Sequence, residues 1–138
     1  MYLLDTNVIS EMRQNKPNQS PQVRRWAAAQ APARLFLSAI TILELEEGVQ
    51  ALQRRMPPQG STLRRWLDGV RQGFQDRILA FGESAAVLCA AAHVQRPRAE
   101  RVAMIAATGL EHGFTIVTRN TGDFEDMGVQ LLNPWLQH

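Results

Sequence analysis

The stretch HGFTIVTRNTGDF, residues 112–124, decides the fold class. Gly113 is placed as a typical helix stop, because glycine tolerates the left-handed backbone with which many helices end. The run 114–117 that follows is apolar without interruption, which is the pattern of a strand buried on both faces. Strands of this kind belong to parallel sheets that helices cover on both sides. The polar loop after the run, with Asp123 in it, is then expected at the carboxyl edge of such a sheet.

Strands and helices are predicted to alternate along the rest of the chain. Short apolar runs predict strands over residues 2–4, 34–38, 78–81, 114–117 and 129–132. Helical spacing and caps predict helices over about 8–13, 21–30, 42 onward, 61 onward, 83–94 and 99–112, with loops over 14–20 and 56–60. This alternation predicts an α/β fold, a parallel sheet of about four to five strands with helices on both faces, in which residues 1–138 form one domain.

The composition fits a packed domain of the cytoplasm. Hydrophobic residues make up 45% of the chain and charged residues 20%. No apolar run reaches the roughly 18 residues of a membrane span, and Asp5 falls where a signal peptide would need apolar residues. The single cysteine, Cys89, excludes an intramolecular disulfide, as is usual in a reducing compartment. We therefore expect a cytoplasmic protein that does not enter the membrane.

Arginine dominates the basic residues. Of 15 basic residues only Lys16 is a lysine, and arginine pairs stand at 24–25, 54–55 and 64–65. Arginine suits phosphate contacts, but such pairs also occur on solvated helix faces. The net charge of +2 is compatible with an RNA substrate and does not indicate one.

Three acidic residues fall at the predicted carboxyl edge of the sheet. Asp5 follows the first strand, Glu44 is expected in the first turn of the helix after the second, and Asp123 follows the strand 114–117. Carboxylates gathered in one pocket repel each other unless a cation lies between them. Mg²⁺ and Mn²⁺ prefer such oxygen ligands and can activate water against a phosphodiester. The three residues therefore predict an acidic metal pocket of a kind that cuts nucleic acid.

Each of these residues also has a purely structural interpretation. Asp5 could cap the helix that follows it, Glu44 could complete a capping box with Thr41, and Asp123 could cap a turn. Short polar residues add to the same edge, and capping alone would also explain the first two of them: Thr6, Asn7, Thr118 and Asn120. The coincidence of three acids at strand ends favours the metal pocket.

Other site classes lack their motifs. The chain has no glycine-rich dinucleotide or phosphate loop, no HExxH, no CxxC and no GxSxG. A response-regulator receiver would need a lysine after a late strand, but the only lysine is Lys16. A haloacid-dehalogenase-type phosphatase would need Asp-x-Asp after the first strand, where this chain has Asp5-Thr6-Asn7.

Four segments in order resemble PIN-domain ribonucleases, and among them the VapC-type toxins of type II toxin–antitoxin systems, FitB-like branch. The segments are LLDTNVISE (3–11), LSAITILELEEGV (37–49), MIAATGLEHGFTIVTRNTGDF (104–124) and GVQLLNPW (128–135). The resemblance implies a PIN-like three-layer fold, Mg²⁺ or Mn²⁺ dependence and endonucleolytic cleavage of RNA. It also implies a VapB-like antitoxin as partner, a homodimer, and contact with DNA only through the antitoxin.

The resemblance assigns roles to the same residues. The metal-binding acids of the family correspond to Asp5, Glu44 and Asp123, while Thr118 and Asn120 match catalytic-site positions and Thr6 and Asn7 supporting ones. One position departs from the family pattern: Val102 stands where the family has a fourth metal-binding aspartate. Glu100 is not expected to replace it, because two residues on a helix are roughly 200° apart around the axis.

Two expectations follow from Val102. The chain is expected to be an endoribonuclease whose metal binding and activity are impaired, in a protein made more stable by the missing charge. The alternative is an inactive PIN domain that serves as a binding module, pairing with its antitoxin and taking part in autoregulation.

Overall fold

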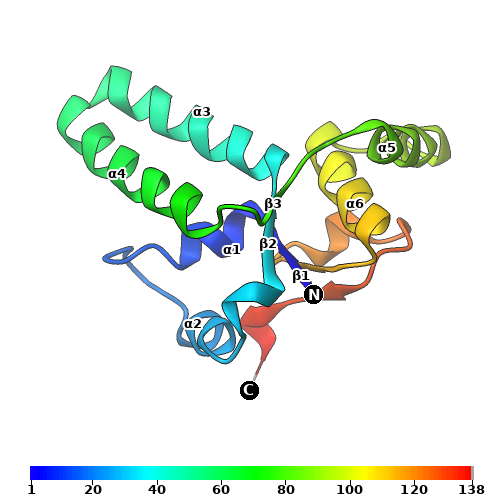
Figure 1. Ribbon diagram of the computed structural model, residues 1–138, viewed down its shortest axis with the longest axis horizontal. Coiled ribbons are helices and arrows are strands. Elements are labelled where there is room, and N and C mark those ends of the chain that lie inside the picture. The colour runs from blue at the N-terminus through cyan, green and yellow to red at the C-terminus, as the bar shows by residue number, and fades with distance from the viewer. Residues whose placement is uncertain (138) are drawn as a thin grey trace.

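The computed structural model describes residues 1–137, so residue 138 of the predicted domain lies outside the described residues. Strands and helices alternate over most of the described chain (Figure 1). The strands are β1 (Tyr2–Leu4), β2 (Leu35–Ser38), β3 (Ile78–Leu79), β4 (Thr115–Val117) and β5 (Leu131–Leu132). The helices are α1 (Thr6–Glu11), α2 (Pro21–Ala28), α3 (Ala39–Arg55), α4 (Pro57–Gly73), α5 (Glu83–Gln95) and α6 (Glu100–His112), with 3₁₀ turns η1 (Pro32–Arg34), η2 (Thr121–Phe124) and η3 (Pro134–Leu136).

The strands form one parallel sheet in the order β3-β2-β1-β4-β5. The N-terminal strand is therefore central, with β2 on one side and β4 on the other. The chain extends the sheet from β1 in one direction and then crosses to β4 in the other. The direction reverses between β1 and β4, and the carboxyl ends of the strands at such a point are the usual ligand position in sheets of this kind. The predicted parallel α/β sheet is confirmed.

Alternating side chains of the central strands fill two separate cores. Leu3 and Ile116 belong to the core under α5 and α6, whereas Leu4 and Val117 belong to the core under the other helices, and none of the four is exposed to solvent. Successive strand residues point to opposite faces, so two covered faces require an uninterrupted apolar run. Figure 1 shows the α3–α4 pair and the α5–α6 pair on opposite sides of the strands, which confirms the three-layer prediction.

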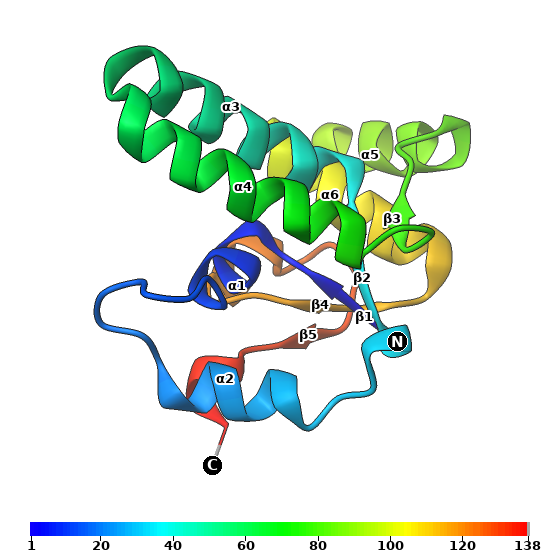
Figure 2. The same ribbon diagram turned by 60° about the vertical axis from the view of Figure 1, so that its left-hand side comes forward.

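Helix α4 begins earlier than predicted. The stretch 56–60 is predicted as a loop and the next helix from residue 61 onward, but α4 begins at Pro57, directly after α3. Proline is tolerated in the first turn of a helix because the N–H that it lacks has no partner there. Gly60 is then a packing residue, since a Cβ on it would come within 2.4 Å of Gln53 Cα on α3. Figure 2 shows the resulting hairpin of two long helices lying side by side.

Helix α3 also begins earlier than predicted, at Ala39 in place of about residue 42. Ser38, the last residue of β2, is its cap, and its hydroxyl accepts a hydrogen bond from the Thr41 N–H at 3.0 Å. Glu44 therefore lies in the second turn of α3, and the capping box with Thr41 is not formed. This leaves the Glu44 carboxylate free to face other elements.

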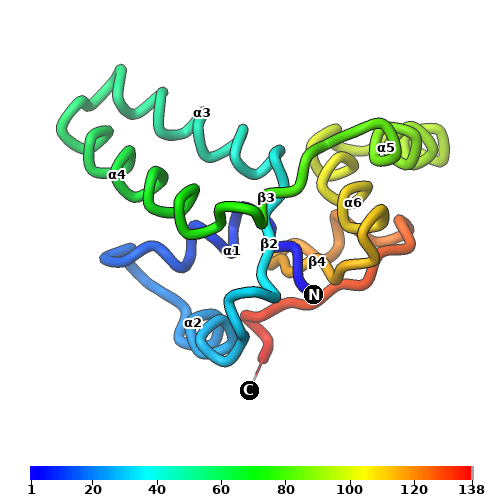
Figure 3. The backbone as a smooth tube through the Cα atoms, viewed as in Figure 1, coloured from blue at the N-terminus to red at the C-terminus, as the bar shows by residue number. Residues whose placement is uncertain are grey.

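The other predicted elements agree within a few residues at their ends. Gly113 ends α6 in the left-handed conformation, with φ of 69°. The backbone trace in Figure 3 shows α1 beneath the α3–α4 hairpin, next to the central strand. Within residues 1–137, no helix combines the length and apolar character needed to cross a bilayer.

Candidate active site

Asp5 lies directly at the end of the central strand and is buried, with 8% of its surface exposed. It is the N-cap of α1, because its Oδ1 accepts a hydrogen bond from the Thr6 N–H at 2.8 Å. The capping interpretation of Asp5 is thus confirmed, but a cap uses only one of the two carboxylate oxygens. The second oxygen, Oδ2, accepts hydrogen bonds from other residues.

That second oxygen is held by the residue at the end of the neighbouring strand. Thr118, which is fully buried, donates its hydroxyl to Asp5 Oδ2 at 2.8 Å and accepts from the Asn120 N–H at 3.0 Å. Asn7 lies at 3.4 Å from both Asp5 Oδ2 and Thr118 Oγ1, and its own oxygen accepts from the Arg119 N–H at 3.3 Å. The predicted polar residues after β1 and β4 therefore form one hydrogen-bonded network that fixes Asp5.

Glu44 joins the network from α3. The Thr6 hydroxyl donates to Glu44 Oε1 at 2.7 Å, and it also lies 3.3 Å from the Thr41 hydroxyl. Thr6, the first residue of α1, thus connects that helix to two residues one turn apart on α3. Thr41 is fully buried, and sequence reasoning had considered it only as part of a capping box.

Asp123 reaches the site from η2, after β4. It is exposed, and its backbone N–H donates to the Asn120 carbonyl at 3.0 Å within the 3₁₀ turn. The next residue, Phe124, is fully buried in the core under α6 and anchors the turn. Asp123 is therefore exposed on the turn after β4, whereas Asp5 is buried at the end of β1.

The charges of Glu44 and Asp123 act on the carboxyl group of Asp5. Burial raises the pKa of Asp5 above its ordinary value, and the negative charges of Glu44 and Asp123 raise it further. The hydrogen bonds from Thr118 and Thr6 act in the opposite direction, because they favour the ionised form. The acids that the sequence predicted to converge are close enough for this mutual repulsion, which a cation would relieve.

The donor set fits a hard divalent cation in its chemistry, since every group is an oxygen. Within residues 1–137, however, no three acidic, histidine or cysteine side chains are grouped closely enough to hold a metal ion between them. The Asp5 oxygens are engaged with Thr6 and Thr118, and Glu44 with Thr6. The arrangement is that of a site whose carboxylates are positioned by neighbours and lack a complete ligand cage.

Val102 is the residue for which the resemblance predicts a fourth acid. It lies in the first turn of α6 and packs, half-buried, against the core under α5 and α6. The adjacent Arg101 forms a bidentate ion pair with Glu47, one turn beyond Glu44 on α3. Sequence reasoning missed this ion pair, and no sequence signal connects residues 54 positions apart. Burial raises the pKa of the Cys89 thiol on α5, and the charge of Glu100 raises it further.

Replacing Asp5 by asparagine is expected to stabilise the fold at neutral pH by on the order of 1 kcal/mol. The raised pKa means that the folded state binds the Asp5 proton more tightly than the unfolded state does. Stability at this position therefore falls as the pH rises from the unfolded-state pKa through the raised folded-state pKa. Asparagine carries no charge and can still cap α1. Urea unfolding of both proteins between pH 4 and 8 should show that the variant exceeds the unchanged chain in free energy of unfolding most clearly near pH 8.

Asp68→Asn is the matched control for this experiment. Asp68 is exposed on α4, with Arg64 3.7 Å away, so its replacement should change stability by less than about 0.5 kcal/mol. If Asp5→Asn lost stability at pH 8 relative to this control, the hydrogen bonds of the carboxylate would outweigh its repulsion.

Comparison with known proteins places the chain among toxins and their relatives. The PIN domain matches residues 2–130. The plasmid stability protein StbB of Pseudomonas syringae pv. tomato is 38% identical over 98% of this chain and 99% of its own, and the toxin FitB of Neisseria gonorrhoeae is 36% identical with the same coverage. The crystal structure of FitAcB from Neisseria gonorrhoeae superimposes with a TM-score of 0.86 at 36% identity, covering 99% of both chains.

Proposed function

The chain belongs to the PIN-domain family, and from that premise we propose that it is the toxin of a type II toxin–antitoxin pair and a metal-dependent endoribonuclease. Similarity over almost the full length to FitB and to the VapC ribonuclease Y4jK of Sinorhizobium fredii, at 36% identity, supports the assignment. The observation that carries it is the buried Asp5 at the carboxyl end of β1, on which the charges of Glu44 and Asp123 act.

The proposed metal ligands are Asp5, Glu44 and Asp123, with Mg²⁺ or Mn²⁺ as the cation. When bound, the cation supplies Lewis-acid activation of water and neutralises charge on the phosphate. The chain's own residues position the site: Thr118 and Thr6 hold the carboxylates of Asp5 and Glu44 in fixed orientations. Asn120, whose N–H binds Thr118, is placed by the same turn that carries Asp123 and is proposed to orient the substrate phosphate.

The proposed partners follow from the relatives. Structures similar to this chain include FitAcB and a FitAB complex bound to an IR36 DNA fragment, the latter with a TM-score of 0.87 at 34% identity. We propose a VapB-like antitoxin as the cognate partner, a homodimer as the toxin assembly, and DNA contact through the antitoxin. The proposed compartment is the cytoplasm, where RNA is accessible.

The test is a cleavage assay on a panel of RNAs, with Mg²⁺ or Mn²⁺, for the unchanged chain and for Val102→Asp. Cleavage by the variant, abolished by EDTA and by Asp5→Asn in the same background, is the expected result. If neither protein cuts any RNA in the panel, the endoribonuclease assignment is wrong.

The second candidate is an inactive PIN domain that works by binding its antitoxin. Two observations favour it: an apolar Val102 where the resemblance predicts a fourth acid, and, over residues 1–137, no grouping of three ligands that could hold a metal. It predicts that calorimetric titration with Mg²⁺ or Mn²⁺ gives no heat of binding while the antitoxin binds tightly. A measurable metal affinity in the unchanged chain would exclude it.

A further inference from the structure

A pocket adjoins the candidate active site and extends away from it between α1, α3 and α4. Its volume is about 270 Å³. Two site residues, Thr6 and Glu44, form one end of its lining. The rest of the lining includes two basic residues from the segment after α1, Arg13 and Lys16. It also includes Gly48 of α3 and Trp66 of α4. None of these four was singled out with the site from the sequence, because only the fold brings them next to Glu44.

The pocket changes sign along its length. The site end carries the Glu44 carboxylate, whereas Arg13 and Lys16 bring positive charge. Lys16 is held in place by Glu11, with 3.3 Å between Nζ and Oε1, and the buried Glu11 is itself fixed by the Ser20 N–H at 2.8 Å. Of the ion pairs formed within residues 1–137, none involves Arg13. Its guanidinium therefore has charge available for an anionic ligand.

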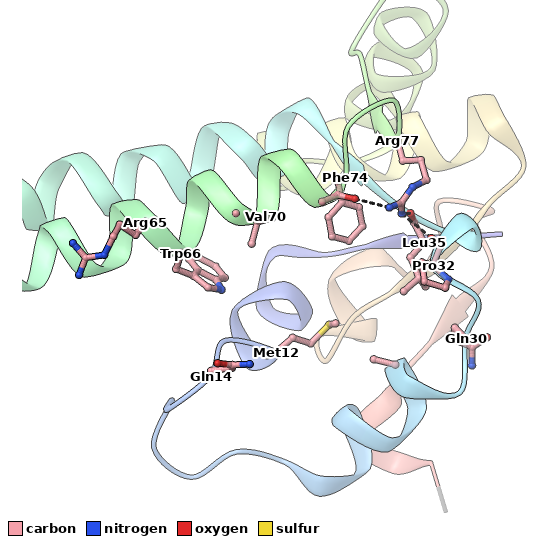
Figure 4. A pocket seen from close by; sticks show the side chains of 13 residues that line it. Met12, Gln14, Gln30, Pro32, Leu35, Arg65, Trp66, Val70, Phe74 and Arg77 are labelled. Atoms are coloured by element: carbon pink, nitrogen blue, oxygen red, sulfur yellow. Dashed lines mark hydrogen bonds between the residues drawn. The ribbon is translucent and has the colours of Figure 1, made fainter.

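An aromatic ring and an open wall complete the pocket. Trp66 projects from α4 towards the end of α1, and Figure 4 shows it facing the side of Met12. The indole is half-buried and lines both this pocket and the apolar groove drawn in Figure 4. On the opposite wall, a Cβ added to Gly48 would meet nothing within 4 Å. The absence of a side chain at Gly48 therefore leaves space on the α3 side of the pocket.

We propose that this pocket binds a nucleotide of single-stranded RNA adjacent to the phosphate that is cut. Arg13 and Lys16 contact the backbone phosphates, and Trp66 stacks on the base. Cations placed a short distance from a carboxylate site suit a polyanion whose next phosphate lies at that site. Stacking on an indole requires a base that is free of its own helix, which selects single strands over duplexes. The inference rests on the proposed function and adds a substrate form and three contact residues to it.

The experiment measures binding without cleavage. Fluorescence anisotropy in EDTA, with a labelled mixed-sequence RNA and its duplex, gives affinities for the unchanged chain, Arg13→Gln and Trp66→Leu over a series of salt concentrations. Arg25→Gln is the matched control, because Arg25 is exposed on α2, away from the pocket. Thermal unfolding of each variant confirms that it is folded.

For single-stranded RNA, loss of one phosphate contact reduces the steepness of the plot of log affinity against log salt concentration by about 0.7. This change corresponds to about eightfold weaker binding at 50 mM salt. That result is expected for Arg13→Gln, and about tenfold weaker binding for Trp66→Leu. Arg25→Gln should match the unchanged chain, and duplex RNA should bind more weakly to the unchanged chain and respond less to Trp66→Leu.

The outcomes separate the pocket from the nuclease assignment. If Val102→Asp cuts RNA but Arg13→Gln binds RNA as well as Arg25→Gln does, the pocket inference is overturned and the proposed function stands. RNA binding that depends on Arg13 and Trp66 in a protein that cuts nothing supports the pocket and contradicts the enzyme. The absence of RNA binding, or an equal dependence on Trp66 for duplex RNA, overturns the inference. The inference is also overturned if Arg13→Gln and Trp66→Leu weaken antitoxin binding and leave RNA binding unchanged.

Discussion

Val102→Asp is expected to raise the rate of RNA cleavage by roughly 100-fold at a fixed, subsaturating Mg²⁺ concentration. Groups that only support metal ligands change affinity or activity by about 10- to 100-fold, and a missing carboxylate ligand should reach at least the upper end of that range. Val102 lies in the first turn of α6, next to Arg101, which already connects α6 to α3 beside Glu44. Under the proposed function, an acid at this position adds a fourth carboxylate to an oxygen-rich set suited to a divalent cation.

Val102→Asn is the matched control, because it has nearly the size of aspartate without its charge. It should leave cleavage at the level of the unchanged chain, and single-turnover rates over a range of Mn²⁺ concentrations would separate metal affinity from chemistry. If asparagine restored activity as well as aspartate, polarity and not a metal ligand would be responsible. If aspartate restored nothing, position 102 would have no role in the site.

The same substitution should lower stability in the absence of metal. It removes an apolar side chain from the core under α5 and α6 and adds a charge near Asp5, whose pKa is already raised. Saturating metal should then reverse the loss, by about 2.7 kcal/mol at a concentration 100 times the dissociation constant. A thermal shift with Mn²⁺ in Val102→Asp, and a smaller one in the unchanged chain, would show this linkage directly.

Gly60→Ala is expected to destabilise the fold by about 3 kcal/mol, at the upper end of what overpacking costs. The new Cβ would come within 2.4 Å of Gln53 Cα and 2.6 Å of Gln53 N, so a backbone must move and no side chain rotation can relieve the contact. The α3–α4 hairpin would open at its tip, where the two helices approach most closely. Equilibrium urea unfolding followed by circular dichroism measures the loss.

Gly69→Ala on the same helix serves as the control for Gly60→Ala. A Cβ at Gly69 meets nothing within 4 Å, and alanine favours a helix over glycine by up to about 1 kcal/mol, so this variant should be more stable. Opposite signs for two identical substitutions on one helix would attribute the Gly60 effect to the interhelix contact. A stabilising Gly60→Ala would mean that α3 and α4 do not approach as closely as described.

The sequence predicted the sheet well because its strands are short apolar runs with no helical alternative. Phe114 to Val117 could only be buried on both faces, and the polar residues after it could only lie at the carboxyl edge. Asp5 and Thr118 were therefore predicted at one site although 113 positions separate them, and their hydrogen bond confirms it. Ligand sites of parallel sheets form at the carboxyl ends of the strands, so this prediction needs only the strand ends and no knowledge of side-chain packing.

Predictions failed where local signals competed. Pro57 and Gly60 were interpreted as loop residues, but proline fits a first helical turn and Gly60 is required by the approach of α3. Glu44 was given a possible capping box because Thr41 precedes it, whereas Ser38 caps α3 one turn earlier. The approach of α3 and α4 decided the role of Gly60, whereas a competing cap three residues before Thr41 decided the start of α3.

The central position of β1 has a consequence for the synthesis of the protein. The strand β1 acquires its second neighbour, β4, only when residues 115–117 have emerged from the ribosome. Asp5 consequently has no Thr118 to hold it until the chain has been synthesised beyond residue 118, and a product truncated before that point lacks this hydrogen bond. Loops of this length also close slowly, since pairing distant segments requires a large loss of chain entropy. The candidate site is therefore completed only after the segments from β1 to β4 have all been synthesised.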